Sequence, residues 1–125
     1  MKYVSTRGKS EPKEFKEILL EGLAPDGGLY VPEEYPKFTD NDINSLRGKT
    51  YQETALRILR TFITDIPEAD LKKLIARTYT KEVFGTADIT PLKNLENGLS
   101  LLQLSNGPTL AFKDVPLQWL GNLME

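Results

Sequence analysis

The chain of 125 residues has the length of one compact domain, and its 39% hydrophobic and 27% charged residues are ordinary for a folded protein. A formal net charge of -2 argues against nucleic-acid binding driven by bulk charge. The absence of cysteine excludes disulfides, thiolate nucleophiles and cysteine-bound zinc, and the absence of histidine removes the commonest general base and metal ligand. Lysine, carboxylates, hydroxyls or a cofactor must therefore carry any chemistry.

Membrane spans, secretory signals and metal sites are not indicated by the sequence. Its apolar runs are only a few residues long, and its N-terminus lacks the apolar core of a signal peptide. No dense cluster of carboxylates offers a metal site. We therefore expect a cytoplasmic protein that binds neither a membrane, nor nucleic acid, nor a metal ion.

Short strands and amphipathic helices alternate in the first third of the chain. In order, the predicted elements are a short strand at 2–6, a helix from about Pro12 to Gly22, a short strand at 29–31 and a short helix from Thr39 to Gly48. Proline suits the first turn of a helix, and glycine is a common helix stop. Pro32 ends the second strand, because proline cannot donate a ladder hydrogen bond.

Two longer helices are predicted in the middle of the chain. Thr50 and Glu53 have the spacing of a capping box, and they precede apolar residues that repeat with helical spacing as far as Phe62. Pro67 opens the next helix, with Leu71 among its inward-facing residues. Residues 83–89 have no clear pattern.

A strand, a loop and a helix are predicted near the end of the chain. Asn97-Gly98 is typical of a tight hairpin turn, and residues 99–104 are apolar enough for a buried strand. A loop with glycine and proline follows, and the last helix starts near 114–116. No helix stop signal precedes Glu125, which suggests the front end of a longer protein.

Lys113, at the start of this last helix, is the candidate for chemistry. Its neighbours at 110–112 are apolar, which predicts a partly sheltered side chain and so favours the neutral amine. A neutral amine can form a Schiff base with an aldehyde, and pyridoxal 5'-phosphate (PLP) is the usual partner. Alternatively, Lys113 simply reaches solvent or pairs with Asp114.

Three blocks of the sequence resemble the threonine synthase family. Residues 105–114, SNGPTLAFKD, resemble its PLP-lysine motif of Gly-Pro-Thr, two residues and Phe-Lys-Asp. The blocks at 3–8 (YVSTRG) and 22–32 (GLAPDGGLYVP) resemble two further stretches of the family in the same order and spacing. Two positions depart from the commoner pattern: Asn106 stands where many relatives have histidine, and Pro116 replaces a small residue.

The resemblance implies that the chain is the N-terminal portion of a fold-type II PLP enzyme. The intact family enzyme is α/β, whereas this piece should be α+β and helix-rich with short strands. Residues 1–98 would form the N-terminal domain. Residues 99–125 would be the truncated start of the PLP-binding domain.

The resemblance also implies an activity, the conversion of O-phospho-L-homoserine and water to L-threonine and phosphate, which is the last step of threonine biosynthesis. Lys113 would bind PLP and act as the catalytic amine. Ser105, Asn106 and Thr109 lie on the loop that approaches Lys113, and their side chains are candidates to orient the substrate carboxylate or phosphate. Asp114 either orients Lys113 or caps the helix.

Family members are several times longer than this chain, and their glycine-rich phosphate loop lies downstream. We therefore expect the 125 residues to bind PLP weakly or not at all, and to be inactive alone. The apolar face of the last helix should allow self-association. Two alternatives stay open: a threonine-synthase-like phospholyase that acts on another phosphorylated amine, and a non-catalytic interaction module.

Overall fold

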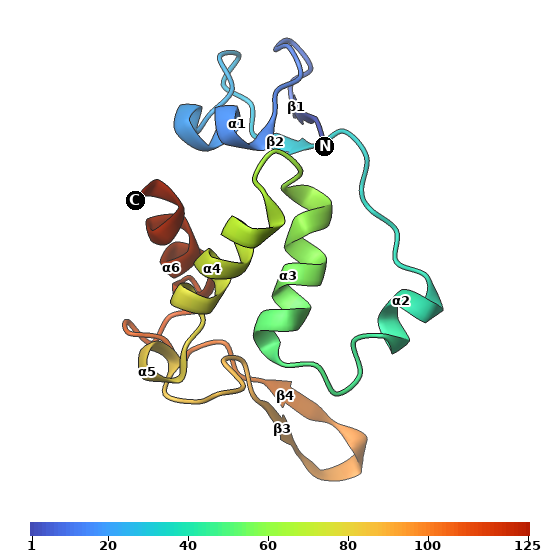
Figure 1. Cartoon of the computed structure of the whole chain (residues 1–125), viewed down its shortest axis with the longest axis vertical. Coiled ribbons are helices and arrows are strands. Elements are labelled where there is room, and N and C mark those ends of the chain that lie inside the picture. Colours follow the sequence, from blue (N-terminus) through green and yellow to red (C-terminus); the bar gives the residue numbers. More distant parts are fainter. The chain divides into compact units, whose positions relative to one another are not determined.

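A computed structural model describes the whole chain, residues 1–125, and gives a helix-rich α+β fold (Figure 1). Its elements are, in order, β1 (Tyr3–Ser5), α1 (Phe15–Glu21), β2 (Tyr30–Pro32), α2 (Asp40–Asn44), α3 (Tyr51–Phe62), α4 (Glu68–Thr78), α5 (Lys81–Phe84), β3 (Leu92–Asn94), the 3-10 turn η1 (Glu96–Gly98), β4 (Ser100–Leu102) and α6 (Asp114–Met124). The α+β, helix-rich fold class is confirmed. None of these helices has the length and apolar content needed to cross a membrane.

The chain divides into two compact units, which are described separately. Unit 1 comprises residues 1–48 and 56–71, and unit 2 comprises residues 49–55 and 72–125. Each unit contains one two-stranded antiparallel ribbon, β1–β2 in unit 1 and β3–β4 in unit 2. The predicted domain boundary between residues 98 and 99 is not tested by this division and stays a prediction.

In unit 1, the β1–β2 ribbon pairs Tyr3 with Pro32. The second strand therefore includes the proline that was expected to end it. This is possible because Glu33 N donates to Lys2 O at 2.9 Å, so the alternation of the backbone turns the Pro32 nitrogen away from β1. A two-stranded ribbon has an unpaired outer edge, where the missing proline N–H costs nothing.

Helix α1 begins at Phe15, three residues after the predicted start at Pro12. Lys13 cannot join the helix, because it exchanges both of its backbone hydrogen bonds with Tyr3, at 2.8 and 3.0 Å. The predicted end is confirmed: Gly22 closes the helix with a φ of 79° and donates its N–H to the Ile18 carbonyl. Local strand pairing thus overrides the start signal of proline but leaves the glycine stop intact.

The turn between α1 and β2 is organised by the carboxylate of Asp26. It accepts hydrogen bonds from the Ser5 hydroxyl at 2.7 Å and from the amides of Gly28 and Lys9 at 2.9 Å. A Cβ on Gly28 would lie 2.1 Å from the Ser5 hydroxyl oxygen, so this position has room for glycine alone. The Ser5 hydrogen bond, helped by the two amides and opposed by burial, lowers the pKa of Asp26 to about 2.

This network predicts how the stability of the chain depends on acid. The folded pKa of Asp26 lies below its ordinary value of 3.8, so its contribution to the free energy of unfolding is present above pH 3.8 and is lost as the pH falls towards 2. Asp26→Asn should lower stability at pH 7 and flatten the loss between pH 4 and pH 2. Circular dichroism during urea unfolding at a series of pH values measures both effects. The exposed Asp40→Asn is the matched control, and an equal slope in both variants would contradict the assignment.

The predicted helix starts at Thr39 and Thr50 are confirmed by reciprocal capping. The Glu53 amide donates to the Thr50 hydroxyl at 3.2 Å, and the Thr50 amide donates to the Glu53 carboxylate at 2.9 Å. Thr39 and Asp42 repeat this arrangement before α2. The four-residue α5 begins before the segment 83–89, which has no clear pattern, and ends inside it; Thr80 caps its start, and Gly85, with a φ of 72°, ends it.

Unit 2 is built around an aromatic cluster centred on Tyr79. The Tyr79 ring lies 5.1 Å from that of Tyr51, 5.9 Å from that of Phe84 and 6.3 Å from that of Trp119, measured between centroids. The planes of Tyr79 and Trp119 are only 9° apart, so these rings stack. Burial raises the pKa of Tyr79, so its hydroxyl stays protonated and donates to the Val115 carbonyl at 3.2 Å.

The hairpin β3–β4 confirms the predicted turn but not the predicted burial. Asn97 and Gly98 have φ values of 59° and 74°, as a type I′ turn requires. Strand β4 covers Ser100–Leu102, within the predicted range 99–104. All of its residues are exposed, and Leu101 has an exposed fraction of 51%. The expectation of a buried strand was wrong for this chain. Strand β4 pairs only with β3, and no other element covers the faces of this two-stranded ribbon.

Candidate functional site

The predicted site lies in unit 2, where the loop 105–113 leads into α6. Asp114 is the first residue of the helix, and its side chain turns back onto this loop. Its carboxylate accepts hydrogen bonds from the Thr109 amide at 2.9 Å, the Thr109 hydroxyl at 2.8 Å and the Ala111 amide at 3.4 Å. Burial opposes ionisation of Asp114, which is 2% exposed, but these hydrogen bonds outweigh it and lower its pKa. The carboxylate thus closes the loop into a compact turn.

Gly107 makes this turn possible. A Cβ at position 107 would lie 2.3 Å from the Cβ of Asp114 and 2.6 Å from one of its carboxylate oxygens. Both contacts are far below the van der Waals limit, so any larger residue would displace the carboxylate. The Gly-Pro pair looks in the sequence like a simple loop breaker, and the close approach to Asp114 is visible only in the structure.

Leu110 adds backbone strain to the same turn. Its φ is +59°, in the left-handed region that non-glycine residues rarely adopt. The Leu110 amide donates to the Gly107 carbonyl at 3.1 Å, which closes the turn around this residue. Strain of this kind persists where the surrounding contacts dictate the conformation, and it is concentrated at functional sites.

Lys113 is exposed, so the expectation that its neighbours shelter it was wrong for this chain. Leu110 and Phe112 are themselves 73% and 62% exposed and form no layer over the amine. Lys113 also forms no ion pair with Asp114, whose carboxylate is occupied by the loop. A run of apolar residues shelters a lysine only if another segment packs over that run.

The other three predicted site residues differ in their surroundings. Ser105 is exposed and Asn106 is half-buried, and neither side chain has a hydrogen-bond partner. The Thr109 hydroxyl, in contrast, donates its proton to Asp114 and keeps only its acceptor lone pairs. The loop therefore carries all four predicted side chains, with three of them unpaired.

Helix α6 lies beside the end of α4 (Figure 1), and hydrogen bonds hold the two helices together. The Asn122 amide donates to the Thr78 hydroxyl at 2.9 Å, and Arg77 donates to the Asn122 carbonyl at 3.0 Å. Together with the bond from Tyr79 to Val115, these contacts hold both ends of the helix. The sequence signals the helix but gives no indication of these partners, because they are distant in the chain.

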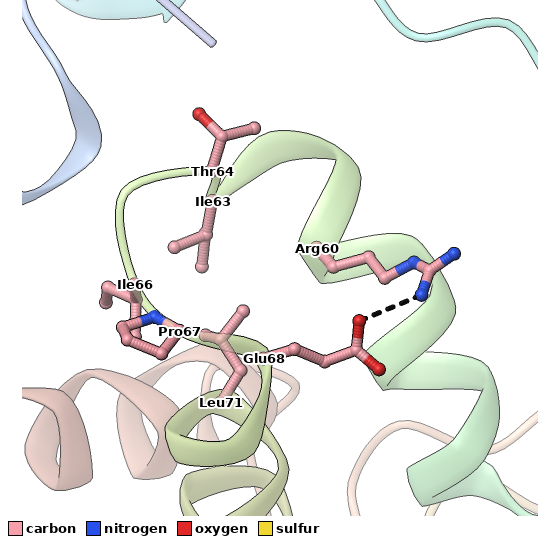
Figure 2. A pocket seen from close by; sticks show the side chains of 7 residues that line it. All are labelled: Arg60, Ile63, Thr64, Ile66, Pro67, Glu68 and Leu71. Atoms are coloured by element: carbon pink, nitrogen blue, oxygen red, sulfur yellow. Dashed lines mark hydrogen bonds and ion pairs between the residues drawn. The ribbon is translucent and has the colours of Figure 1, made fainter.

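Unit 1 contains a cavity of about 420 Å³ (Figure 2). None of the predicted site residues lines it. It is lined by Arg60, Ile63, Thr64, Ile66, Pro67, Glu68 and Leu71. Arg60 and Glu68 pair with each other at 3.0 Å, so the two charges are already satisfied. The cavity has no lysine in its lining, so it has no amine that could form a Schiff base.

Comparisons with known proteins support the resemblance over the whole chain. The family model for the threonine synthase N terminus matches residues 2–79. Threonine synthases from Methylobacillus glycogenes and Pseudomonas aeruginosa are 52% and 47% identical to the whole chain, which corresponds to 28% and 26% of their own lengths.

Solved structures agree with this match. The PLP-bound threonine synthase from Brucella melitensis has 46% identity and a TM-score of 0.93, covering 99% of this chain and 26% of that one. The Escherichia coli threonine synthase has 27% identity and a TM-score of 0.82, covering 99% of this chain and 28% of that one. The chain therefore spans about a quarter of the length of these relatives, and it belongs to the threonine synthase family.

Proposed function

We propose that the chain forms the N-terminal part of an enzyme that converts O-phospho-L-homoserine and water into L-threonine and phosphate. The observation that carries this proposal is the 46% identity and 0.93 TM-score to a PLP-bound threonine synthase, extending over 99% of the chain. The site motif at 105–114 lies within this matched length. The proposal is a PLP-dependent lyase in the intact protein, acting in a cytoplasmic pathway of amino-acid biosynthesis.

Lys113 is the residue that would hold PLP. Its amine is exposed at the start of α6 and is not engaged in an ion pair, so an aldehyde can reach it. When bound, PLP would supply an electron sink for negative charge on the substrate carbon beside the amino group. The described residues contain no glycine-rich phosphate loop of the kind that holds the cofactor's phosphate.

The chain's own contribution to the chemistry would be proton transfer by the Lys113 amine. A free amine at this place could take protons from the α and β carbons of the substrate and return protons to the α carbon and to the terminal carbon, which becomes the methyl group of threonine. Positioned proton transfer typically contributes about 10²–10⁴-fold to a rate. The phosphate group would leave from the terminal carbon, and water would add to the carbon next to it.

Three side chains of the loop would orient the substrate. Ser105 and Asn106 have donors without partners, so they suit the substrate carboxylate or phosphate. Thr109 differs, because its proton is given to Asp114 and it can only accept a hydrogen bond. It would therefore suit the substrate amino group better than an anion.

The organisation of the chain within the enzyme is part of the same proposal. Residues 1–98 would belong to the N-terminal domain, and residues 99–125 would begin the PLP-binding domain. We propose that the 125 residues alone are inactive, since Lys113 is exposed without a sheltering layer. The apolar face of α6 is exposed at Leu117, Leu120 and Met124, which supports self-association of the isolated chain.

A chimera tests the proposed function directly. Residues 1–125 of this chain would replace the matching quarter of the Brucella melitensis threonine synthase. We expect the chimera to form L-threonine and phosphate from O-phospho-L-homoserine and to show the visible absorbance of bound PLP. The 125-residue chain alone should show neither.

Two outcomes would contradict the proposal. A folded chimera that binds PLP but releases no phosphate from this substrate would favour a phospholyase with another substrate. A folded chimera that does not bind PLP would favour the non-catalytic module. Circular dichroism and size-exclusion chromatography verify folding in each case.

A further inference from the structure

We propose that Asp114 is a positioning residue for Lys113, which acts by holding the loop 107–111 in the shape that presents the amine. The proposal rests on the proposed function of Lys113 and adds a role for its neighbour. Asp114 is buried and Lys113 is exposed, as expected for adjacent residues about 100° apart around a helix. The two side chains do not pair, so Asp114 acts on the amine through the backbone and not by contact.

The carboxylate is the common partner of the loop. Its two oxygens bind the Thr109 amide, the Thr109 hydroxyl and the Ala111 amide. Leu110 lies between Thr109 and Ala111, and its φ of +59° is unfavourable for leucine. The hydrogen bonds to Asp114 compensate for this strain, so a loop without the carboxylate should relax to another conformation.

Gly107 packs directly against the Asp114 side chain and leaves no free space there. Gly107 is buried, and even one additional carbon there would overlap the Asp114 side chain. The length of the acidic side chain is therefore as important as its charge. A glutamate at position 114 would carry the same charge but would have to push the loop away from the helix.

A second anchor lies immediately after Asp114. The Tyr79 hydroxyl holds the Val115 carbonyl at 3.2 Å, from within the aromatic cluster of unit 2. Lys113 thus stands between a loop fixed by Asp114 and a helix fixed by Tyr79. Its backbone has little freedom, although its side chain is exposed.

The inference also gives Thr109 a defined polarity. Because its hydroxyl proton is bonded to Asp114, Thr109 presents an acceptor and a methyl group to its surroundings. Loss of the carboxylate would free that proton and allow the hydroxyl to donate. Asp114 therefore influences both the place of Lys113 and the hydrogen-bonding character of the loop beside it.

Amide hydrogen exchange on the 125-residue chain tests the loop arrangement. Asp114→Asn keeps the size of the side chain but replaces one carboxylate oxygen by an amino group. We expect the Thr109 and Ala111 amides to exchange at least about 10-fold faster in this variant, and Thr109→Val to give a smaller increase at the same amides. Asp88→Asn, at an exposed position of unit 2, is the matched control. Unchanged exchange in Asp114→Asn would overturn the inference.

Kinetics of the chimera test the effect on Lys113. We expect Asp114→Asn to lower kcat by about 10- to 100-fold with KM changed much less, as for a displaced catalytic group. Asp114→Glu should not restore kcat, because Gly107 leaves no space for the longer side chain. Thr109→Val, which retains the carboxylate and the two backbone amides that bind it, is the second variant if Asp114→Asn does not fold. It should lower kcat by a smaller factor, and a wild-type kcat in Thr109→Val would then overturn the inference.

The two proposals fail in different ways. If Lys113→Ala retains activity in the chimera, the proposed function of Lys113 fails and the inference fails with it. If Lys113→Ala is inactive but Asp114→Asn has wild-type kcat and KM, only the inference fails. If Asp114→Glu is as active as the wild type, the charge suffices and the positioning role is excluded.

Discussion

Lys113→Ala in the chimera should abolish phosphate release from O-phospho-L-homoserine. The substitution removes both the amine that would attach PLP and the group that would transfer the proton. Proton transfer alone contributes about 10²–10⁴-fold, so we expect kcat to fall by at least about 10²-fold. The visible absorbance of attached PLP should disappear as well. Phosphate release and absorbance spectra measure the two effects independently.

Two further variants serve as controls. Lys113→Arg tests whether the positive charge alone is sufficient, and Lys72→Ala tests whether removing any exposed lysine lowers activity. Lys113→Arg keeps a positive charge but has no amine for attachment, so it should be as inactive as Lys113→Ala. Lys72→Ala removes an exposed lysine of α4 and should retain wild-type activity. If Lys113→Arg were active, charge and not the amine would be the essential property.

Trp119→Ala should be the most destabilising single substitution in α6. Trp119 is 8% exposed and stacks on Tyr79, so its removal deletes a large buried ring from the centre of unit 2. Truncations of this kind cost about 3–5 kcal/mol. This is a large part of the usual stability of a small domain, about 5–15 kcal/mol. Urea unfolding followed by circular dichroism measures the change, since Trp119 is the only tryptophan and its own fluorescence is lost.

Leu117→Ala is the control for Trp119→Ala. It removes an apolar side chain from the same helix at a position that is 53% exposed, so it should cost less than about 1 kcal/mol. Trp119→Phe retains a ring and should fall between the two. Equal unfolding midpoints for Trp119→Ala and Leu117→Ala would show that the aromatic stack does not stabilise unit 2.

Signals that lie within a single turn of the chain predicted their structure correctly. Thr50 and Glu53 are three residues apart, and the capping bonds form within one turn, so the sequence contains all of the necessary information. Asn97-Gly98 likewise determines its own turn. The start of α1 was predicted wrongly, because Lys13 pairs with Tyr3, a residue outside the local window.

Burial depends on partners that local sequence does not name. The apolar residues around Lys113 and in β4 indicated shelter, yet they are exposed in this chain. The motif around Lys113 identified the family, which the comparisons confirmed. The roles of Gly107 and Tyr79 were not predictable, because both depend on contacts with α6 that form only in the folded chain.

The members of the aromatic cluster are also synthesised at different times during translation. Tyr51, Tyr79 and Phe84 all precede α6, so most of the surface that receives Trp119 exists before that residue is synthesised. At a synthesis rate of roughly 5–20 residues per second, the helix that begins with Asp114 emerges seconds later. The turn that carries Lys113 is therefore completed only when Trp119 of α6 packs against the earlier members of the aromatic cluster.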